Sequence, residues 1–166
     1  MTEPEGMVLR RPVPDDHPRV WAVVDEWWGG RRMRALLPRL WLEHFAGTSW
    51  IAERAVDGRL VGFLVGFVSQ DDPAIAYVHM VATDPNRRQA GLGRALYERF
   101  FADARARGAT RVTAVTWPGN RISVAFHRAL GFRVDDGPGT QPLYGTPSHP
   151  DHDGEGEDRV VFFREL

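Results

Sequence analysis

The chain has 166 residues, of which 43% are hydrophobic, so it can bury an ordinary core, and we expect a single domain over residues 1–166. Its formal net charge of −1 at pH 7 gives no sign of a nucleic-acid partner or of binding to an anionic membrane. The absence of cysteine excludes disulfides, thiolate metal sites and a cysteine nucleophile, so any catalysis must use oxygen, imidazole or backbone groups.

The N-terminal part predicts a short strand followed by two helices. Its first residues include acids and a proline where a signal peptide is apolar, and no apolar run approaches the roughly 20 residues of a membrane span, so we expect a cytoplasmic protein. A strand over 7–14 precedes a helix that begins near Asp15 or Asp16 and ends before Gly29. A second helix is expected over 31–45, with Pro38 as a break or kink.

The rest of the chain alternates strands with helices. An Asp-Gly turn between the first two of its strands is a hairpin signal. The expected strands are 50–55, 60–69, 74–83, 111–116, 132–134 and 159–166, and the expected helices are 91–107 and 121–130. The segment 135–158 is rich in acids, glycine and proline and is expected to be a long loop. Because a crossover helix joins the strands at 74–83 and 111–116, we expect an α/β protein with a mixed sheet covered by helices.

A glycine turn, RRQAGLGR from Arg87 to Arg94, joins the strand at 74–83 to the next helix. Gly91 and Gly93 let the backbone approach a ligand, and the unpaired N–H groups of the first helical turn attract an anion. Glycines at such a junction also serve only to turn the chain, so both interpretations stay open. A P-loop is excluded because the chain has no lysine. A dinucleotide-binding turn is also excluded, because its motif needs a third glycine at the position of Leu96.

Two motifs resemble those of the GCN5-related N-acetyltransferase (GNAT) superfamily. The stretch from Arg88 to Gly93 matches its Arg/Gln-x-x-Gly-x-Gly/Ala signature, in the same context of strand, signature and helix. Asn120, Ser123 and the stretch from His127 to Phe132 resemble its second motif. The resemblance implies the GNAT fold, an α/β (α+β) architecture with a mixed, mostly antiparallel central sheet of about seven strands. Helices lie on both faces of that sheet, and splayed central strands form a slot for acetyl-CoA.

The resemblance also implies an acetyl-CoA-dependent N-acetyltransferase. The acetyl group moves to a primary amine, expected to belong to a small molecule, by direct attack in a ternary complex. The pyrophosphate is expected on the N–H groups of the glycine turn, with Arg87 or Arg88 adding charge-assisted bonds. A backbone N–H near Val81 or Ala82 is expected to meet the oxyanion. The implied cofactor-binding residues are Val81, Ala82, Thr83, Arg87, Arg88, Gln89, Ala90, Gly91, Leu92, Gly93, Arg94, Asn120, Ser123 and His127.

Two histidines are the catalytic candidates. Strand alternation places Tyr77, His79, Val81 and Thr83 on one face. In the arylalkylamine branch of the superfamily, histidines on this strand remove the amine's proton through water. His79 aligns with one of them and is the candidate general base, with a purely hydrogen-bonded histidine as the alternative. His127 stands where the superfamily most often carries a tyrosine that protonates the leaving thiolate. It is the candidate general acid, or it only lines the coenzyme A channel.

The acceptor site is expected between the first two helices and the segment 135–158. Two adjacent indoles cannot both face one core, so one of Trp27 and Trp28 is expected to line a pocket, or else to fill a gap under the sheet. The candidate substrate residues are Glu26, Trp27, Trp28, Tyr77 and Tyr144. The acids of 135–158 attract a cationic amine or are only solvated. His149 and His152 resemble a metal site superficially, and no metal is expected.

Other functions stay open beside a small-molecule acetyltransferase. A protein acetyltransferase acting on an N-terminus or a lysine has the same fold. A non-catalytic acyl-CoA-binding or sensor module is favoured by the missing tyrosine. A nucleotide-phosphate-binding regulatory domain would share the anion site, but this chain has no acidic residue at a recognisable spacing to bind a ribose. The exposed aromatics suit a homodimer interface, so a homodimer is a further open alternative.

Overall fold

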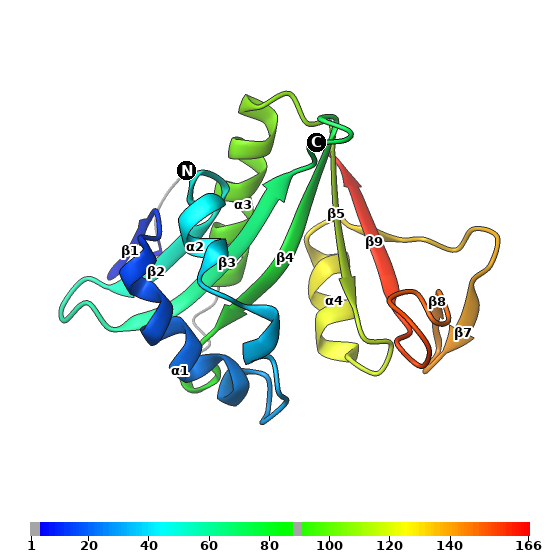
Figure 1. The fold of residues 1–166 in the computed structure, drawn as a ribbon, viewed down its shortest axis with the longest axis horizontal. Coiled ribbons are helices and arrows are strands. Elements are labelled where there is room, and N and C mark those ends of the chain that lie inside the picture. The colour runs from blue at the N-terminus through cyan, green and yellow to red at the C-terminus, as the bar shows by residue number, and fades with distance from the viewer. Residues whose placement is uncertain (1–3, 88–90) are drawn as a thin grey trace.

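The computed structural model describes residues 4–87 and 91–166, which form one large sheet with helices on both faces (Figure 1). The sheet has seven strands in the order β1-β2-β3-β4-β5-β9-β6. Its neighbouring strands are antiparallel except for β4 and β5, which run parallel. The predicted mixed, mostly antiparallel sheet is confirmed.

Most elements lie within two residues of their predicted positions. The strands of the sheet are β1 (Met7–Arg10), β2 (Trp50–Arg54), β3 (Leu60–Val68), β4 (Ile75–Thr83), β5 (Arg111–Thr116), β6 (Arg133–Val134) and β9 (Val160–Glu165). The α-helices are α1 (His17–Trp27), α2 (Leu40–His44), α3 (Leu92–Ala106) and α4 (Arg121–Ala129). Short 3-10 helices cover Pro14–Asp16, Arg34–Leu36, Ala46–Thr48 and Pro85–Arg87. None of the helices in the described parts of the chain is both long and apolar enough to cross a membrane.

Three predicted segments differ from the structure. The strand expected over 7–14 ends at Arg10, because Pro12 and Pro14 have no N–H to donate to a ladder. The helix expected over 31–45 is interrupted, and its α-helical part begins only after Pro38. The loop expected over 135–158 contains a small hairpin of β7 (Gln141–Leu143) and β8 (Thr146–Ser148).

A hydrophobic cluster on each face holds the helices to the sheet. On one face, α3 packs through Leu92, Leu96 and Phe100, whose spacing of four keeps them on one side of the helix. On the other face, α1 and α2 pack against a separate cluster that includes Phe63 of β3. Since both of its faces are covered, β3 is buried along most of its length, which explains its nearly continuous apolar sequence.

The neighbours β4 and β5 separate halfway along β4. Their pairing runs from Ile75 and Arg111 to Val78 and Ala114, although both strands continue beyond it. At the same place the register between β3 and β4 shifts, so that His79 is an extra residue in β4. Such a bulge bends its strand and increases the local twist. Figure 1 shows β4 and β5 diverging from this point, which confirms the predicted splayed strands.

Gly66 of β3 lies opposite the bulge and has contacts that suit a glycine at this position. A Cβ on Gly66 would lie 2.6 Å from the Phe100 ring and 2.7 Å from the Tyr77 carbonyl oxygen, so no larger residue fits without movement. The backbone groups of Gly66 bond to buried hydroxyls, because its carbonyl accepts from Thr48 Oγ1 at 2.6 Å and its N–H donates to Ser49 Oγ at 3.3 Å. These contacts fix β3 where its partner strand changes register.

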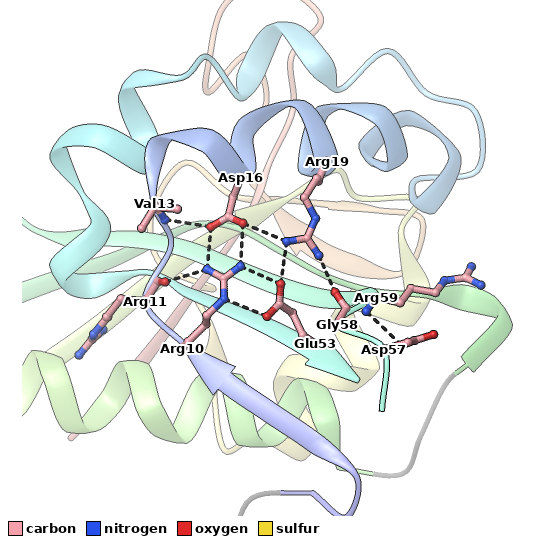
Figure 2. Close-up of polar contacts among 9 residues, drawn as sticks. All are labelled: Arg10, Arg11, Val13, Asp16, Arg19, Glu53, Asp57, Gly58 and Arg59. Atoms are coloured by element: carbon pink, nitrogen blue, oxygen red, sulfur yellow. Dashed lines mark hydrogen bonds and ion pairs between the residues drawn. The ribbon is translucent and has the colours of Figure 1, made fainter. Parts of the chain in front are cut away.

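An ionic network joins β1, β2 and the start of α1 (Figure 2). Arg10, at the end of β1, donates to both carboxylate oxygens of Asp16 at 2.7 Å and to those of Glu53 in β2 at 2.9 and 2.7 Å. Arg19 of α1 donates to Glu53 and to the carbonyl of Gly58, both at 2.7 Å. These forked bonds fix where the first helix leaves the sheet.

Asp16 is the most buried member of this network. It was expected as a possible helix cap, but its carboxylate accepts from Arg10 and from the Val13 N–H at 2.9 Å instead. Burial by itself raises the pKa of Asp16, but the bonds from Arg10 and Val13 outweigh it, so the pKa lies below its ordinary value. Asp16 is therefore ionised at neutral pH and stabilises the fold in that form.

Replacing Asp16 by asparagine is expected to lower the free energy of unfolding by roughly 2–4 kcal/mol at pH 7, because Arg10 loses a buried, forked partner. Urea denaturation followed by circular dichroism measures the change. The neighbouring Asp15, with 93% of its side chain exposed, provides the matched control, and Asp15→Asn should leave the free energy nearly unchanged. Equal losses in the two variants would contradict the role given to the network.

Candidate functional site

Several predicted site residues lie around the split between β4 and β5. Tyr77 and His79 belong to β4, on either side of its last pairing with β5. Asn120 lies at the start of α4, shortly after β5 ends. Gly91 begins α3, which follows β4. The split thus brings together residues from both sequence motifs.

The bulge at His79 changes the order in which β4 residues face the two sides of the sheet. Tyr77 contacts Phe67, and Met80 belongs to the cluster under α1. Val81 instead packs against the cluster under α3. The prediction that Val81 shares a face with Tyr77 and His79 was therefore wrong, because one extra residue shifts the alternation of a strand by one position.

His79 is half-buried beneath the segment that joins α1 to α2. Its ring stacks on Trp41, with centroids 4.1 Å apart, and its Nε2 lies 2.7 Å from the Leu36 carbonyl oxygen. A carbonyl oxygen only accepts, so Nε2 carries the proton in the neutral ring and Nδ1 keeps its lone pair. Burial lowers the pKa of His79 despite the opposite effect of the Leu36 carbonyl. The ring is therefore neutral at pH 7 and has one basic nitrogen.

His127 has a different environment, since it is buried within α4 with 4% exposure. Its Nδ1 donates to the Ser123 carbonyl oxygen at 2.8 Å, so Nε2 accepts from the Tyr97 hydroxyl at 2.7 Å. The ring also stacks on Phe162 at 4.3 Å. Burial lowers the pKa of His127 to about 4, although the Ser123 carbonyl opposes this. At pH 7 the ring is neutral, and both of its nitrogens are bonded inside the protein.

Tyr97, the partner of His127, was missed by the sequence analysis. It is fully buried on α3, and burial raises the pKa of its hydroxyl, which stays protonated. It lies four residues before Phe101, directly after Leu96 in the row of apolar residues by which α3 packs on the sheet. The spacing could have placed Tyr97 in the core, but the hydrogen bond to a residue thirty positions later has no local signal.

The two glycines of the turn each have a local structural role. Gly91 has a φ of 102°, a conformation that other residues rarely adopt, and it opens α3. A Cβ on Gly93 would lie 2.9 Å from the Phe126 ring, so this glycine allows α3 and α4 to approach. Arg94 donates from its side chain to the Ala129 carbonyl oxygen at 2.9 Å. Of the other predicted residues here, Arg88, Gln89 and Ala90 lie outside the described residues and Arg87 is described by its backbone alone.

Asn120 and Ser123 shape the start of α4. Asn120 Oδ1 accepts from the Ser123 N–H at 3.1 Å and caps the helix, which confirms the predicted entry of α4. Within the described residues the amide nitrogen of Asn120 makes no hydrogen bond, so it can donate to a ligand. Ser123 Oγ lies 3.2 Å from His127 Nδ1.

The two tryptophans at the end of α1 share one core contact. Both rings pack on Phe63, with centroid distances of 6.1 Å for Trp27 and 6.2 Å for Trp28. Both indoles therefore face one core, contrary to the prediction, because α1 ends between them and Trp28 has left the helical conformation. Glu26 is exposed on the same helix.

Tyr144 belongs to an aromatic group that the sequence analysis did not assemble. It lies in the turn between β7 and β8 and is 61% exposed. Its ring centroid is 5.2 Å from that of Trp117, which directly follows β5. The guanidinium carbon of Arg31, from the segment after α1, lies 4.9 Å from the Trp117 ring centroid. Residues from three distant segments therefore meet at the end of β5.

The acids between residues 135 and 158 pair with histidines of the same segment and with Arg159, which lies 2.7 Å from both Asp153 and Glu157. His149 lies 2.7 Å from Asp135, and this hydrogen bond holds the pKa of Asp135 below its ordinary value. The rings of His149 and His152 are 5.8 Å apart. In residues 4–87 and 91–166, no group of three or more His, Cys, Asp or Glu side chains is arranged to hold a metal ion.

Comparisons with known proteins agree with this geometry. The model of the acetyltransferase (GNAT) family matches residues 10–132. L-2,4-Diaminobutyric acid acetyltransferase of Nocardia farcinica is 30% identical over 144 residues, which cover 87% of this chain and 74% of that relative. The solved diaminobutyrate acetyltransferase of Paenibacillus lautus, in complex with L-2,4-diaminobutyric acid and coenzyme A, has a TM-score of 0.68 at 23% identity and covers 95% of this chain and 93% of its own.

A second solved structure extends the likeness of the fold. An acetyltransferase of Salmonella typhimurium with acetyl-CoA has a TM-score of 0.69 at 19% identity, with 98% of this chain and 95% of that chain covered. The family match spans the split, the glycine turn and α4, and it stops at Phe132. The chain therefore belongs to the acetyltransferase (GNAT) family and is an acetyl-CoA-dependent acyltransferase.

Proposed function

We propose that this enzyme transfers the acetyl group of acetyl-CoA to a primary amine of a small diamino acid, of the 2,4-diaminobutyric acid type, by direct attack in a ternary complex. The observation that carries the proposal is the 30% identity to a diaminobutyric acid acetyltransferase over most of both chains. The split between β4 and β5 supports it, because it leaves the edge of β4 beyond Val78 unpaired with β5, next to the residues of both motifs.

Acetyl-CoA fits the chain's own residues at the split. From His79 to Thr83 the edge of β4 is not paired with β5, so its backbone groups are available to the amides of an extended pantetheine arm. We place that arm beside Val81, Ala82 and Thr83, with a backbone N–H near Val81 or Ala82 facing the thioester oxygen. Bound there, the donor supplies an acyl thioester.

The other cofactor contacts lie at the starts of two helices. The first turn of α3, from Gly91 to Arg94, has N–H groups without helical partners, which suit a pyrophosphate. The Asn120 amide suits the pantetheine arm, since its oxygen is occupied by the helix cap while its nitrogen can donate. These contacts use backbone and amide donors, so they do not require the lysine that this chain lacks.

We assign the role of general base to His79. Its Nδ1 can take the proton of the incoming ammonium, directly or through one water, and its lowered pKa keeps it unprotonated at neutral pH. Leu36 and Trp41 hold the ring in one orientation. When His79 takes up this proton, its ring becomes charged and the bond from Nε2 to the Leu36 carbonyl strengthens. This stronger bond stabilises the protonated histidine.

His127 does not have a proton to give near pH 7, because it is neutral and its ring nitrogens are both bonded. We therefore propose that it holds the start of α4 in place, through Ser123 and Tyr97, beside the cofactor channel. The leaving thiolate is then stabilised by the N-terminal end of α4 and by solvent.

The first test is thiol release from acetyl-CoA, followed with a chromogenic thiol reagent that has no cysteine of the protein to react with. We expect release that depends on 2,4-diaminobutyric acid in the wild type. Gly91→Asp is expected to abolish both release and acetyl-CoA binding in calorimetry, because it places a carboxylate against the pyrophosphate.

The matched control for this variant is Gly108→Asp at the other end of α3. Both glycines have positive φ, 102° and 88°, and open space around the missing Cβ, so the backbone strain is similar. Retained binding in Gly91→Asp would remove the proposed anion site. Release with peptides bearing a free N-terminus, and with no small amine, would replace the proposal by a protein acetyltransferase.

His79→Ala is expected to lower kcat/KM by about 100-fold or more at pH 7, and by less as the pH rises and the amine loses its proton without help. Burial lowers the pKa of His79 below the ordinary histidine pKa of about 6.5. In the wild type, kcat/KM should therefore fall only when the pH is below about 6.5. Profiles from pH 5 to 10 measure both effects. His44→Ala, which removes an exposed histidine, is the control, and a loss in His79→Ala that does not vary with pH would indicate a structural histidine.

The environment of His127 predicts acid-sensitive stability. Because its pKa is about 4 in the folded protein and 6.5 in the unfolded chain, its contribution is complete above pH 6.5 and is lost as the pH falls to about 4. The loss corresponds to roughly 3 kcal/mol. Urea denaturation between pH 4 and 7 should show this slope in the wild type and a smaller one in His127→Gln. The same slope in both proteins would contradict a neutral, buried His127.

A further inference from the structure

We propose that Arg31, held over Trp117 and beside the Trp117–Tyr144 pair at the open end of the split, binds the carboxylate of the acceptor. This inference rests on the proposed function and adds to it a residue that selects amino acids over simple amines. It is carried by the position of Arg31, by its lack of an acidic partner among residues 4–87 and 91–166, and by the construction of the aromatic pair beside it.

The contact between Arg31 and Trp117 spans the split. Trp117 follows β5, which is one wall of the split. Arg31 belongs to the segment between α1 and α2, and this segment covers β4, the other wall, where the Leu36 carbonyl accepts from His79. One short segment therefore contacts the proposed base and also reaches the end of β5.

The backbone on either side of Arg31 is fixed by Asp25 of α1. The Gly30 N–H donates to the Asp25 carbonyl at 2.8 Å. The side chain of Asp25 accepts from the N–H groups of Met33 and Arg34, at 2.8 and 3.0 Å. These bonds hold the segment in a compact turn, so Arg31 is positioned before any ligand binds, which reduces the entropic cost of binding.

The guanidinium of Arg31 is available to an anion. In the same segment, Arg34 lies 3.5 Å from Asp25, and Arg39 pairs with Glu43 at 2.7 Å and with Asp15 at 3.4 Å. Arg31 is exposed, and within the described residues its contact is the Trp117 ring, with no ion pair or hydrogen bond. A guanidinium has five N–H donors in a planar fork that matches a carboxylate.

The aromatic pair is built at a structural cost. Tyr144 has a φ of 51°, as the first residue of the two-residue turn before Gly145, where asparagine or glycine is the usual choice. The Trp117 ring lies where a Cβ on Gly119 would overlap it, so that glycine makes room for the indole. Strain retained around two exposed rings points to a role in binding rather than in the core.

The amine and the carboxylate of an amino-acid acceptor match two positions in the site, His79 and Arg31. The amine must reach the split beside His79, while the carboxylate meets Arg31 and the carbon chain lies along Trp117 and Tyr144. A carboxylate at Arg31 forms charge-assisted hydrogen bonds that a decarboxylated amine cannot form. The enzyme should therefore prefer an amino acid to the amine that remains when its carboxylate is removed.

The test compares acceptors in pairs that differ by the carboxylate, 2,4-diaminobutyric acid with 1,3-diaminopropane and lysine with cadaverine, in the thiol-release assay. We expect the wild type to prefer the acid of a pair that it accepts. Arg31→Gln should lower kcat/KM for the acid by about 10- to 100-fold, mainly through KM, and leave the decarboxylated amine unchanged. Arg32→Gln, an exposed neighbour, is the matched control and should change neither.

A second variant separates binding from folding. Tyr144→Asn should keep or raise the melting temperature, because asparagine tolerates positive φ, while raising KM for the acid. Equal effects of Arg31→Gln on both members of a pair, or a wild-type preference for the decarboxylated amine, would overturn the role of Arg31 and leave the acetyltransfer proposal intact. Acetyl-CoA binding without thiol release on any amine would overturn the proposed function, and this inference with it.

Discussion

The extra residue at His79 is the constraint on which the site depends. A regular strand would keep β4 paired with β5 along its length and would turn every second residue to the same side. The bulge ends that pairing after Val78, and it brings His79 and Met80 to the side of α1. One local irregularity therefore produces both the slot and the position of the proposed base. Its cost is met nearby, because Gly66 leaves room for Phe100, and Thr48 and Ser49 satisfy the backbone groups of Gly66.

The walls of the split are held from outside it. The Arg10 network fixes the start of α1 to β1 and β2, and Asp25 fixes the segment that follows α1. Through Leu36, that segment in turn orients the His79 ring. A base whose orientation is set by packing and by a backbone bond needs little reorganisation when the amine arrives. The same chain of contacts explains why charged residues far from the split, such as Asp16, stabilise the scaffold that carries the chemistry.

Residue periodicity was enough to predict the regular part of the fold. Helices α3 and α4 and strand β5 lie within one residue of their predicted bounds, because their apolar spacing and flanking glycine or asparagine residues are local signals. The predictions that failed depend on features that spacing does not encode. An extra residue in β4 moved Val81 to the other face, and Pro38 interrupted a helical pattern of apolar residues. The bond between Tyr97 and His127 and the meeting of Arg31, Trp117 and Tyr144 join segments far apart in sequence, so only the fold brings them together.

The two histidines have different environments, which favour different roles. Burial lowers the pKa of both, but His79 has a nitrogen that faces no partner among the described residues, whereas Tyr97 and Ser123 occupy both nitrogens of His127. A neutral imidazole with a free lone pair is a base, and one with both nitrogens bonded is a structural element. The motif that contains His127 therefore specifies how α4 is held. The residues proposed to bind the acceptor lie outside both motifs, at the end of β5 and after α1, so the sequence motifs of the donor site do not reveal them.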